Sequence, residues 1–479
     1  MFLLLINCRS IPLIRRRSRI IKEKGRNAAA LPNDLTATQA AAQGKGRPKV
    51  ADTAAPSLVE LLNLFRAADP TTRQELERKS ELGRAVVADR LTLLADLGLI
   101  DESETGTATG GHAPRLVRLA ARRGRVLVAT LDQTALGVGL ADLAGNLLTE
   151  HHEEFELNAP PELLAERLTT LLHWSLDRQS SPAGLWGISL SVPGTVPGAE
   201  GDFLTRTPPV VPAWEGFPLV EHLTRSFGAP VWMRFSVETM TLGELYGGAG
   251  QGLSSMLFIK IGRRIGAGIV SDGGLYRGAQ GATGLIGALP ARQGDRSGTL
   301  DTMAGSDMIL REGHHAAKTG RSAYLADNLR WGGEVTALDV AQAAQMGDDA
   351  CTEILTTSGR LIGQIVATLT NTLNPEVIVL SGSIVQTNDI MLVAVREAVY
   401  GASHPLVTRD LRIIRSQMGS SAGLVGAARA AAELLFAPAF LKDWVMQGSP
   451  LNHPGFTAFR GSLDLAPPPQ TPPPRKGAQ

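Results

Sequence analysis

The sequence predicts an α/β protein of two lobes, preceded by a small winged helix-turn-helix. Three observations lead to this fold class. Residues 57–120 hold three short segments with helical apolar spacing, followed by a polar, wing-like hairpin. From Arg125 the chain changes to a strand meander and then to alternating helices and strands, which is the pattern of one α/β lobe. A second run of this kind begins at Met256 and continues to a terminal helix.

These patterns divide the chain into five parts. Residues 1–56 are expected to be a basic, disordered leader and linker, since the first fifty residues hold eleven Lys and Arg against two acidic residues. The winged helix takes residues 57–120, the first lobe 121–250 and the second lobe 251–445, and the terminal helix of the second lobe can pack on the first. Residues 446–479, with the run PPPQTPPP, are expected to form a disordered tail.

Composition indicates a soluble globular protein from a reducing compartment. Hydrophobic residues make up 43% and charged residues 19% of the 479 residues, which is typical of such proteins. Cys8 and Cys351 lie far apart, so neither a disulfide framework nor a cysteine-based zinc site is expected. The chain has no run of about 20 apolar residues, and MFLLLI is too short for a signal-peptide core. We therefore expect a cytoplasmic protein without a membrane segment.

The basic run RRRSRIIKEK in the leader has two interpretations. It could be an arm that binds nucleic acid or an anionic membrane, because clusters of Lys and Arg bind such surfaces. It could instead be a solvated leader or an over-long start of the reading frame. The remainder of the chain has a net charge of about −8, so the leader is electrostatically separate from it.

Residues 57–120 carry the pattern of a winged helix-turn-helix. A first helix has apolar residues at helical spacing between Leu58 and Phe65, and Thr71 or Thr72 can cap a short second helix, RQELERKS. A tight turn then leads into a third helix, RAVVADRLTLLADLG. The polar stretch DESETGTATGGHAP and the RLVRL that follows it have the composition of a two-stranded wing.

The third helix has one apolar face and one face poorly equipped to read DNA bases. Its expected buried stripe is Val87, Leu91 and Leu94, and Arg84 and Arg90 flank an opposite face of Ala85, Ala88, Asp89 and Thr92. Base readout usually relies on Arg, Lys, Asn or Gln, whereas an aspartate repels phosphate. We still expect DNA binding, with candidate contacts at Thr72, Arg73, Arg84, Arg90, His112 and Arg115. The alternative is a helical domain kept for packing or for a protein partner.

The two lobes are predicted from buried strands alternating with helices. Strand patterns in the first lobe are VLVATLDQTALGVGLADLAGNLL, LWGISLSVPGTV and PVWMRF. The second lobe opens with a hairpin of strands in Met256–Pro290, and NPEVIVLSGSI, LRIIRS and the helix SAGLVGAARAAAELLF follow. Glycines recur at three-residue spacing after the hairpin, as in a tightly folded loop beside a cleft: Gly278, Gly281, Gly284 and Gly287. The sequence has no repeat of fixed period.

Taken in order, these segments resemble the ROK family of repressors, uncharacterised proteins and sugar kinases. The resemblance covers about 310 residues through GISLSVPGTV, PVWMRF with ELYGGAG, the Met256–Pro290 stretch, NPEVIVLSGSI and SAGLVGAA. SELGRAVVADRLTLLADLGLI and TGGHAPRLVRL resemble the winged helix of ROK regulators. The resemblance implies an actin-like ATPase (RNase H-like) sugar kinase fold, in which ATP and sugar meet between the two lobes.

The resemblance also indicates which positions should carry kinase chemistry, and these positions depart from the family pattern. The first phosphate loop, Asp-x-Gly-Gly-Thr in the family, reads TLDQT here, and Asp132 places a negative charge where phosphate would lie. Phe235 and Ser236 replace the catalytic Asn-Asp pair, and serine is not basic near neutral pH. Glu238 could substitute as the base, but the helix dipole also explains an acidic residue in a first helical turn.

The sugar, zinc and second phosphate positions depart as well. The segment Gly-Glu-x-Gly-His, which grips sugar hydroxyls in the family, reads GLIGA with Leu285 and Ala288, and Pro209 stands where an asparagine commonly contacts sugar. ARQGDRSGTLD replaces the cysteine-rich zinc segment, so no metal is expected. Arg263 and Arg264 occupy the second phosphate loop, where they could bind an anionic effector, remain solvated on a hairpin turn or contact another subunit.

The structural segments persist while the chemical positions depart, so the resemblance implies a non-catalytic transcriptional regulator, a pseudokinase. Its winged helix would bind DNA, and its two-lobed domain would dimerise or sense an effector in a cleft with Ser236, Glu238, Arg263, Arg264 and Thr283. We expect no cofactor; the expected partners are DNA, an unknown small molecule and further copies in a homodimer or a dimer of dimers. Two alternatives stay open: an ATP-dependent sugar kinase with relocated catalytic groups, and a scaffold that binds no DNA.

Overall fold

The computed structural model describes residues 54–67, 71–102, 115–133, 135–179, 183–194 and 216–465. The chain divides into the units Met1–Val50 and Ala51–Gln479, and all the described residues belong to the second unit. Residues 1–53 of the predicted leader and linker and the last 14 residues of the predicted tail therefore lie outside the described residues.

The winged helix-turn-helix is present as predicted. Its elements are α1 (Ala54–Ala67), β1 (Thr71–Thr72), α2 (Arg73–Lys79), α3 (Arg84–Asp96), β2 (Ile100–Asp101) and β3 (Leu116–Leu119). The three strands form one sheet in the order β1-β3-β2. Thr72 caps α2, because its hydroxyl accepts from the Glu75 N–H at 3.2 Å and its own N–H donates to the Glu75 carboxylate at 3.1 Å. The first helix begins three residues earlier than the predicted boundary at Ser57.

The first lobe is built on a five-stranded sheet in the order β6-β5-β4-β7-β8. Its strands are β4 (Gly124–Leu131), β5 (Ala135–Asp142), β6 (Leu147–Glu154), β7 (Gly184–Val192) and β8 (Val231–Phe235). The pairs β4–β5 and β5–β6 are antiparallel, whereas β4–β7 and β7–β8 are parallel. A short 3-10 helix, η1 (Ala121–Arg123), precedes the sheet.

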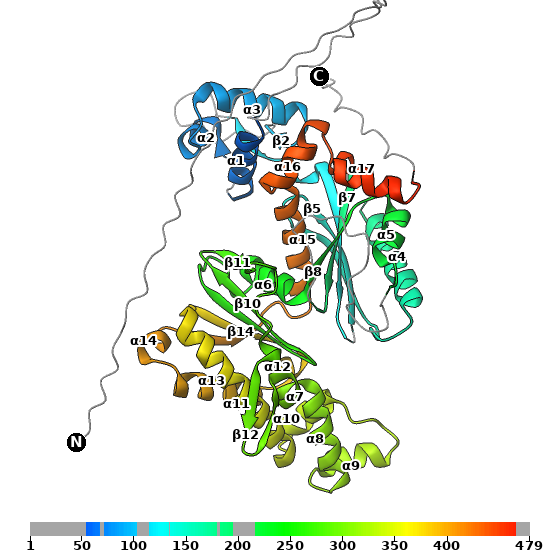
Figure 1. The fold of residues 1–479 in the computed structure, drawn as a ribbon, viewed down its shortest axis with the longest axis vertical. Helices are drawn as coiled ribbons and strands as arrows, with labels where there is room; N and C mark the ends of the chain where they lie inside the picture. Colours follow the sequence, from blue (N-terminus) through cyan, green and yellow to red (C-terminus); the bar gives the residue numbers. More distant parts are fainter. Residues whose placement is uncertain are drawn as a thin grey trace, which may run out of the picture. The chain divides into compact units, whose positions relative to one another are not determined.

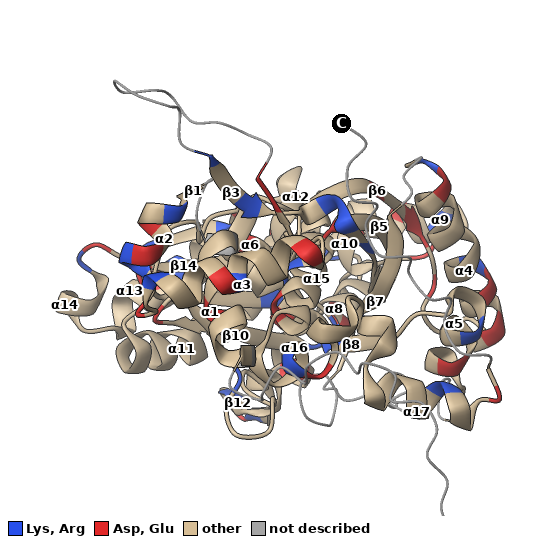
Figure 2. Ribbon diagram, turned by 90° about the horizontal axis from the view of Figure 1, so that it is seen from above, with Lys and Arg blue, Asp and Glu red and all other residues tan. Residues whose placement is uncertain are grey.

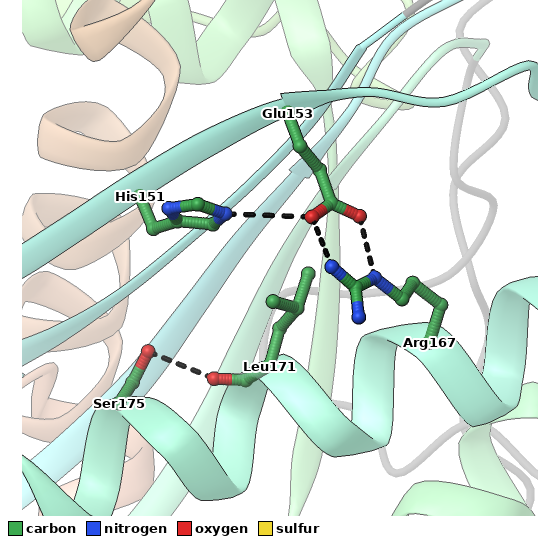
Figure 3. Close-up of polar contacts among 5 residues, drawn as sticks. All are labelled: His151, Glu153, Arg167, Leu171 and Ser175. Atoms are coloured by element: carbon green, nitrogen blue, oxygen red, sulfur yellow. Dashed lines mark hydrogen bonds and ion pairs between the residues drawn. The ribbon is translucent and has the colours of Figure 1, made fainter.

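Helices α4 (Pro161–Asp177) and α5 (Leu219–Phe227) cover one face of this sheet (Figure 1). A polar contact joins α4 to the edge strand β6: Arg167 Nε donates to Glu153 Oε1 at 2.7 Å, and His151 Nε2 lies 3.4 Å from Glu153 Oε2 (Figure 3). Hydrogen bonding to Arg167 lowers the pKa of Glu153. This contact ties the helix to a strand that carries polar side chains at the sheet edge.

The second lobe repeats the sheet of the first lobe. Its order is β11-β10-β9-β14-β15, with β9 (Met256–Ile261), β10 (Ile265–Ser271), β11 (Gly274–Tyr276), β14 (Val377–Ser381) and β15 (Arg412–Arg415). As in the first lobe, the pairs β9–β10 and β10–β11 are antiparallel. The pairs β9–β14 and β14–β15 are parallel. Two lobes with the same strand order confirm the predicted actin-like fold class, although the sequence has no repeat of fixed period.

Helices of the second lobe cover one face of this sheet and form the largest hydrophobic core. They follow a small hairpin, β12 (Pro290–Gln293) and β13 (Arg296–Thr299), and the 3-10 helix η3 (Ile286–Ala288). The helices are α7 (Leu300–Ala304), α8 (Ser306–Lys318), α9 (Ala323–Arg330), α10 (Ala337–Gln345), α11 (Asp349–Leu373), α12 (Ser383–Thr387), α13 (Ile390–Ala402) and α14 (Pro405–Thr408).

Two crossing helices connect the lobes. α6 (Ser236–Gly247) follows β8 of the first lobe but packs Val237, Leu242 and Leu245 on the strands of the second. α15 (Ser421–Leu435) follows β15 of the second lobe but packs on β4 and β7 of the first. A methyl group on Gly426 of α15 would lie 1.6 Å from the Thr239 carbonyl oxygen, so only glycine permits this crossing.

The chain after α15 differs from the prediction. Residues 446–479 were expected to be a disordered tail, but the structure continues with α16 (Pro438–Trp444), η4 (Val445–Gln447), η5 (Pro450–Asn452) and α17 (Pro454–Ser462). Phe456 and Phe459 of α17 are buried in the core of the first lobe, and Trp444 of α16 is buried against α1 and the first-lobe sheet. The prediction of a disordered tail was therefore wrong for residues 446–465. This stretch contains Gly and Pro, and its few apolar residues show no clear helical period.

No single helix among the described residues is long and apolar enough to span a bilayer. Helix α15 and the segment Pro438–Gln447 are long and apolar enough only when taken together, and the two are bent by 64° relative to each other.

Candidate functional site

The third helix of the winged helix has the two faces that the sequence predicts. Val87, Leu91 and Leu94 are buried, and the exposed positions opposite them are Ala85, Ala88, Asp89 and Thr92. Acidic and basic residues are interspersed along α2 and α3 (Figure 2). The winged helix therefore presents a mixed surface instead of a continuous basic one.

The residues predicted to contact DNA differ in side-chain exposure and in the contacts that they already make. The Arg84 side chain is 88% exposed with only a loose contact to Glu77 at 3.6 Å, and Arg115 is exposed at the start of the second wing strand. Arg73 Nη2 donates to Glu102 at 2.8 Å while staying half exposed. Thr72 is occupied by its helix cap, and His112 lies outside the described residues. Arg84 and Arg115 are thus both exposed, and Arg84 is nearly fully so.

Arg90 is held inside the winged helix. Its side chain is 17% exposed, its Nε donates to the Ser57 hydroxyl of α1 at 3.0 Å, and Nη1 forms a short hydrogen bond to Asp89. Arg90 therefore braces α3 against α1, and its guanidinium is less available to phosphate than the sequence suggested.

At the predicted first phosphate position, Asp132 forms an ion pair that connects the lobes. Lys260 Nζ of β9 donates to Asp132 Oδ2 at 2.8 Å. Burial would raise the pKa of Asp132, but the Lys260 ammonium and the Gln133 N–H bond together hold that pKa below its ordinary value. Lys260 offsets the negative charge of Asp132. This ion pair was not predicted from the sequence. The available signal was one lysine within the apolar strand MLFIKI.

At the position predicted for the family's catalytic pair, the structure has packing groups. Ser236 is buried as the first residue of α6, and its carbonyl accepts from the Thr239 hydroxyl at 2.9 Å. Phe235 packs with α6 against the second-lobe sheet. Val237 Cγ2 lies 2.8 Å from where a side chain on Gly266 would begin, so α6 and β10 are in close contact here.

Glu238 is a buried member of an arginine cluster. Arg277 Nε, from the loop after β11, donates to Glu238 Oε1 at 3.0 Å. Arg234 Nη1 of β8 lies 3.7 Å from Glu238 Oε2, an oxygen that has no hydrogen-bond partner among the described residues. Glu238 therefore contacts two arginines, in addition to the interaction with the helix dipole that the sequence suggested. Sequence reasoning missed Arg234 and Arg277, because only the fold brings β8, α6 and this loop together.

The remaining cleft candidates lie in the second lobe. Arg263 and Arg264 form the exposed turn between β9 and β10, and Arg263 Nε lies 3.3 Å from Asp307 Oδ1 at the start of α8. Thr283 packs against Gly278 inside the glycine-rich loop, where a side chain on Gly278 would begin 2.6 Å from its hydroxyl. Thr283 thus lies in the loop that also holds Arg277, whereas Arg263 and Arg264 lie on the turn between β9 and β10.

The segment ARQGDRSGTLD, at the predicted zinc position, forms most of the β12–β13 hairpin and the start of α7. Leu285 is exposed just before η3, and Ala288 ends that short helix. No group of three or more His, Cys, Asp or Glu side chains suited to a metal occurs in the described part of the chain. A hollow of about 140 Å³ lies beside this hairpin, between α8 and α11, with Arg296, Arg311 and Arg321 along its wall.

The chain is similar to both repressors and sugar kinases. The sequence pattern of the ROK family matches residues 131–433. The xylose repressor of Bacillus spizizenii is 23% identical over 367 residues, which are 76% of this chain and 92% of the repressor. The glucokinase of Halalkalibacterium halodurans is 29% identical over 272 residues, which are 54% of this chain and 81% of the kinase.

A solved structure of a ROK family transcriptional regulator, a homolog of the E. coli MLC protein, has the same fold. Its TM-score is 0.66 at 22% identity, and the alignment covers 82% of this chain and 99% of the regulator. The alignment with the xylose repressor is longer than the range matched by the family pattern, whereas the alignment with the glucokinase is shorter.

Proposed function

Because the chain belongs to the ROK family, we propose that it is a transcriptional regulator that binds DNA through its winged helix and does not phosphorylate sugars. The observation that carries this proposal is the winged helix-turn-helix among the described residues before residue 131, with one face of α3 exposed. Similarity to a repressor over 76% of the chain supports it. The two-lobed domain would dimerise or sense an effector.

The geometry at the kinase positions supports a non-catalytic role. Ser236 stands where a kinase needs a base, and a serine hydroxyl does not accept a proton near neutral pH. Glu238, the one possible replacement, lies beside two arginine side chains instead of standing free for a sugar hydroxyl. Asp132 at the first phosphate position is bound by Lys260.

The proposal is tested by measuring duplex DNA binding at several salt concentrations. We expect the dissociation constant to rise steeply between about 50 and 200 mM salt, because phosphate contacts release counterions. Arg84→Ala and Arg115→Ala should each weaken binding to every duplex and reduce the salt slope by about one. Arg409→Ala, which removes an exposed arginine of the second lobe, is the matched control and should change neither quantity.

Point variants are preferable to deletion of the winged helix. α1 shares a core with α15 and α16, so removing residues 1–120 would uncover Trp444 and Phe440 and confound the result. Absence of binding at about 50 mM salt would contradict the proposal. Transfer of phosphate from ATP to a sugar, abolished by Glu238→Gln, would instead establish the kinase alternative.

A sugar is the first effector to test, since the relative named above is a xylose repressor. A ligand that binds only the folded chain stabilises it by about 2.7 kcal/mol when present at about 100 times its dissociation constant. Thermal unfolding with a panel of pentoses, hexoses and amino sugars should therefore show a clear shift for one member. A scaffold that binds neither DNA nor sugar would show no shift and no duplex binding.

A further inference from the structure

The middle of the exposed face of α3 carries a carboxylate that can distinguish bases by hydrogen bonding. Ala85, Ala88, Asp89 and Thr92 follow the spacing of one helical face and are all exposed. Ala85 and Ala88 offer only methyl groups. The Thr92 hydroxyl already donates to the Ala88 carbonyl at 3.0 Å. The Thr92 oxygen can therefore act only as a neutral acceptor, and the charged Asp89 carboxylate is the stronger acceptor among these four positions.

Asp89 is fixed by a chain of contacts that begins in α1. The Ser57 hydroxyl donates to the Ala54 carbonyl at 2.9 Å, and Arg90 Nε donates to that hydroxyl at 3.0 Å. Arg90 Nη1 then donates to Asp89 Oδ2, while the Asp89 side chain stays 71% exposed. One carboxylate oxygen is thus held by an anchored arginine, and Oδ1 has no hydrogen-bond donor among the described residues.

Arg90 also offsets the repulsion between Asp89 and the phosphates of DNA. An isolated aspartate would be repelled by the phosphates of the groove. Asp89 is paired with Arg90, and Arg84 lies at the start of the same helix with its side chain 88% exposed. The charges of these three residues sum to +1, so the N-terminal part of α3 can approach the backbone while the Asp89 carboxylate faces the bases.

The major groove offers a carboxylate few suitable partners. Cytosine presents its N4 amino group as a donor, whereas thymine O4 and guanine O6 are acceptors that repel a carboxylate. Adenine presents a donor at N6 beside an acceptor at N7, which is less favourable. On the premise of the proposed function, we propose that Asp89 is a specificity-determining residue that accepts a hydrogen bond from a cytosine N4 amino group.

The test is selection of bound duplexes from a randomised library by the full chain and its variants. The wild type should prefer cytosine at one position of each half-site, with binding about tenfold weaker when thymine replaces it. Asp89→Ala should lose the preference at that position. Asp89→Asn should shift the preference to adenine, because an amide pairs with adenine N6 and N7.

Asp96→Ala is the matched control. Asp96 is exposed in the last turn of α3, and its replacement removes the same charge without touching the N-terminal half of the helix. Both alanine variants should bind non-specific DNA somewhat more tightly, but only Asp89→Ala should change a base preference. Thermal unfolding of each variant checks that the fold is intact.

The outcomes separate this inference from the proposed function. If the wild type enriches no duplex, the proposed function fails and the role of Asp89 fails with it. If the wild type enriches a sequence and Asp89→Ala enriches the same bases, the proposed function stands and the role of Asp89 is overturned. A preference for adenine in the wild type would also contradict the assignment to cytosine.

Discussion

Two arginines of α3, Arg84 and Arg90, have different surroundings, and these surroundings decide which of them is available to DNA. Arg84 extends into solvent, whereas Arg90 is bound by Ser57 and Asp89. Both were predicted as DNA contacts from their positions on the helix. The sequence fixes which side of a helix a residue occupies, but it does not show which polar group of another helix lies within reach.

The ion pair between Asp132 and Lys260 is a second contact that depends on the fold, and it predicts a pH-dependent stability. Asp132→Asn should lower the free energy of unfolding by about 1–2 kcal/mol at pH 7, since Lys260 is left mostly buried without its partner. The native pKa of Asp132 lies below its ordinary value of 3.8, so the contribution is complete above that value and is lost as the pH falls through the native pKa.

Denaturant unfolding of the wild type and the variant at several pH values measures this contribution. The difference between the two proteins should shrink on acidification. Asp410→Asn removes an exposed aspartate that also pairs with an arginine, and should have almost no effect at any pH. A difference for Asp132→Asn that stays constant down to about pH 3 would contradict the account.

At the scale of elements, the crossing of α6 and α15 depends on glycine. Gly426→Ala should destabilise the chain by about 3 kcal/mol, because the added methyl group overlaps the Thr239 carbonyl oxygen and the two helices must move apart. Gly401→Ala is the control, since Gly401 lies in α13 with nothing within 4 Å of the new methyl group. It should stabilise the chain by about 0.5–1 kcal/mol through helix propensity.

Denaturant unfolding compares these two glycine variants. Equal stability of both would show that the helices do not cross as closely as the structure has them. A loss confined to Gly426→Ala would support α6 and α15 as the tight connection between the lobes.

Elements with a regular pattern were predictable from the sequence, and irregular ones were not. The buried stripe of α3, the Thr72 cap and the apolar strand β9 follow from spacing and side-chain chemistry alone. α17 was missed because Phe456 and Phe459 are isolated in a stretch of Gly, Pro and Ser. The cluster of Glu238 with two arginines was missed because its members come from three separate elements.

At the scale of the whole molecule, the C-terminal segment joins the winged helix to the first lobe. α16 packs on α1, and Trp444 contacts Trp186 of β7 with ring centroids 5.3 Å apart. The apolar residues of α1, α3, α15 and α16 form one core with strands of the first lobe. This segment lies beyond residue 433, where the match to the family pattern ends.

Ending the chain after Ala437 should therefore loosen the winged helix. The truncation removes Trp444 and Phe456, both fully buried, and loss of one such side chain alone costs about 3–5 kcal/mol. Limited proteolysis should cut the winged helix of the truncated chain much faster. Ending the chain after Leu465 removes no described residue and should leave stability and cleavage unchanged. Equal cleavage of both truncated chains would contradict the connecting role.

The ratio of specific to non-specific DNA affinity tests the central claim, that this chain is a regulator and not an enzyme, most directly. The measurement compares a duplex enriched from a random library with an unrelated duplex of equal length at about 150 mM salt. A regulator should bind the enriched duplex about 10³-fold more tightly or better. Equal affinity for the two duplexes, or no binding to either, would contradict the account.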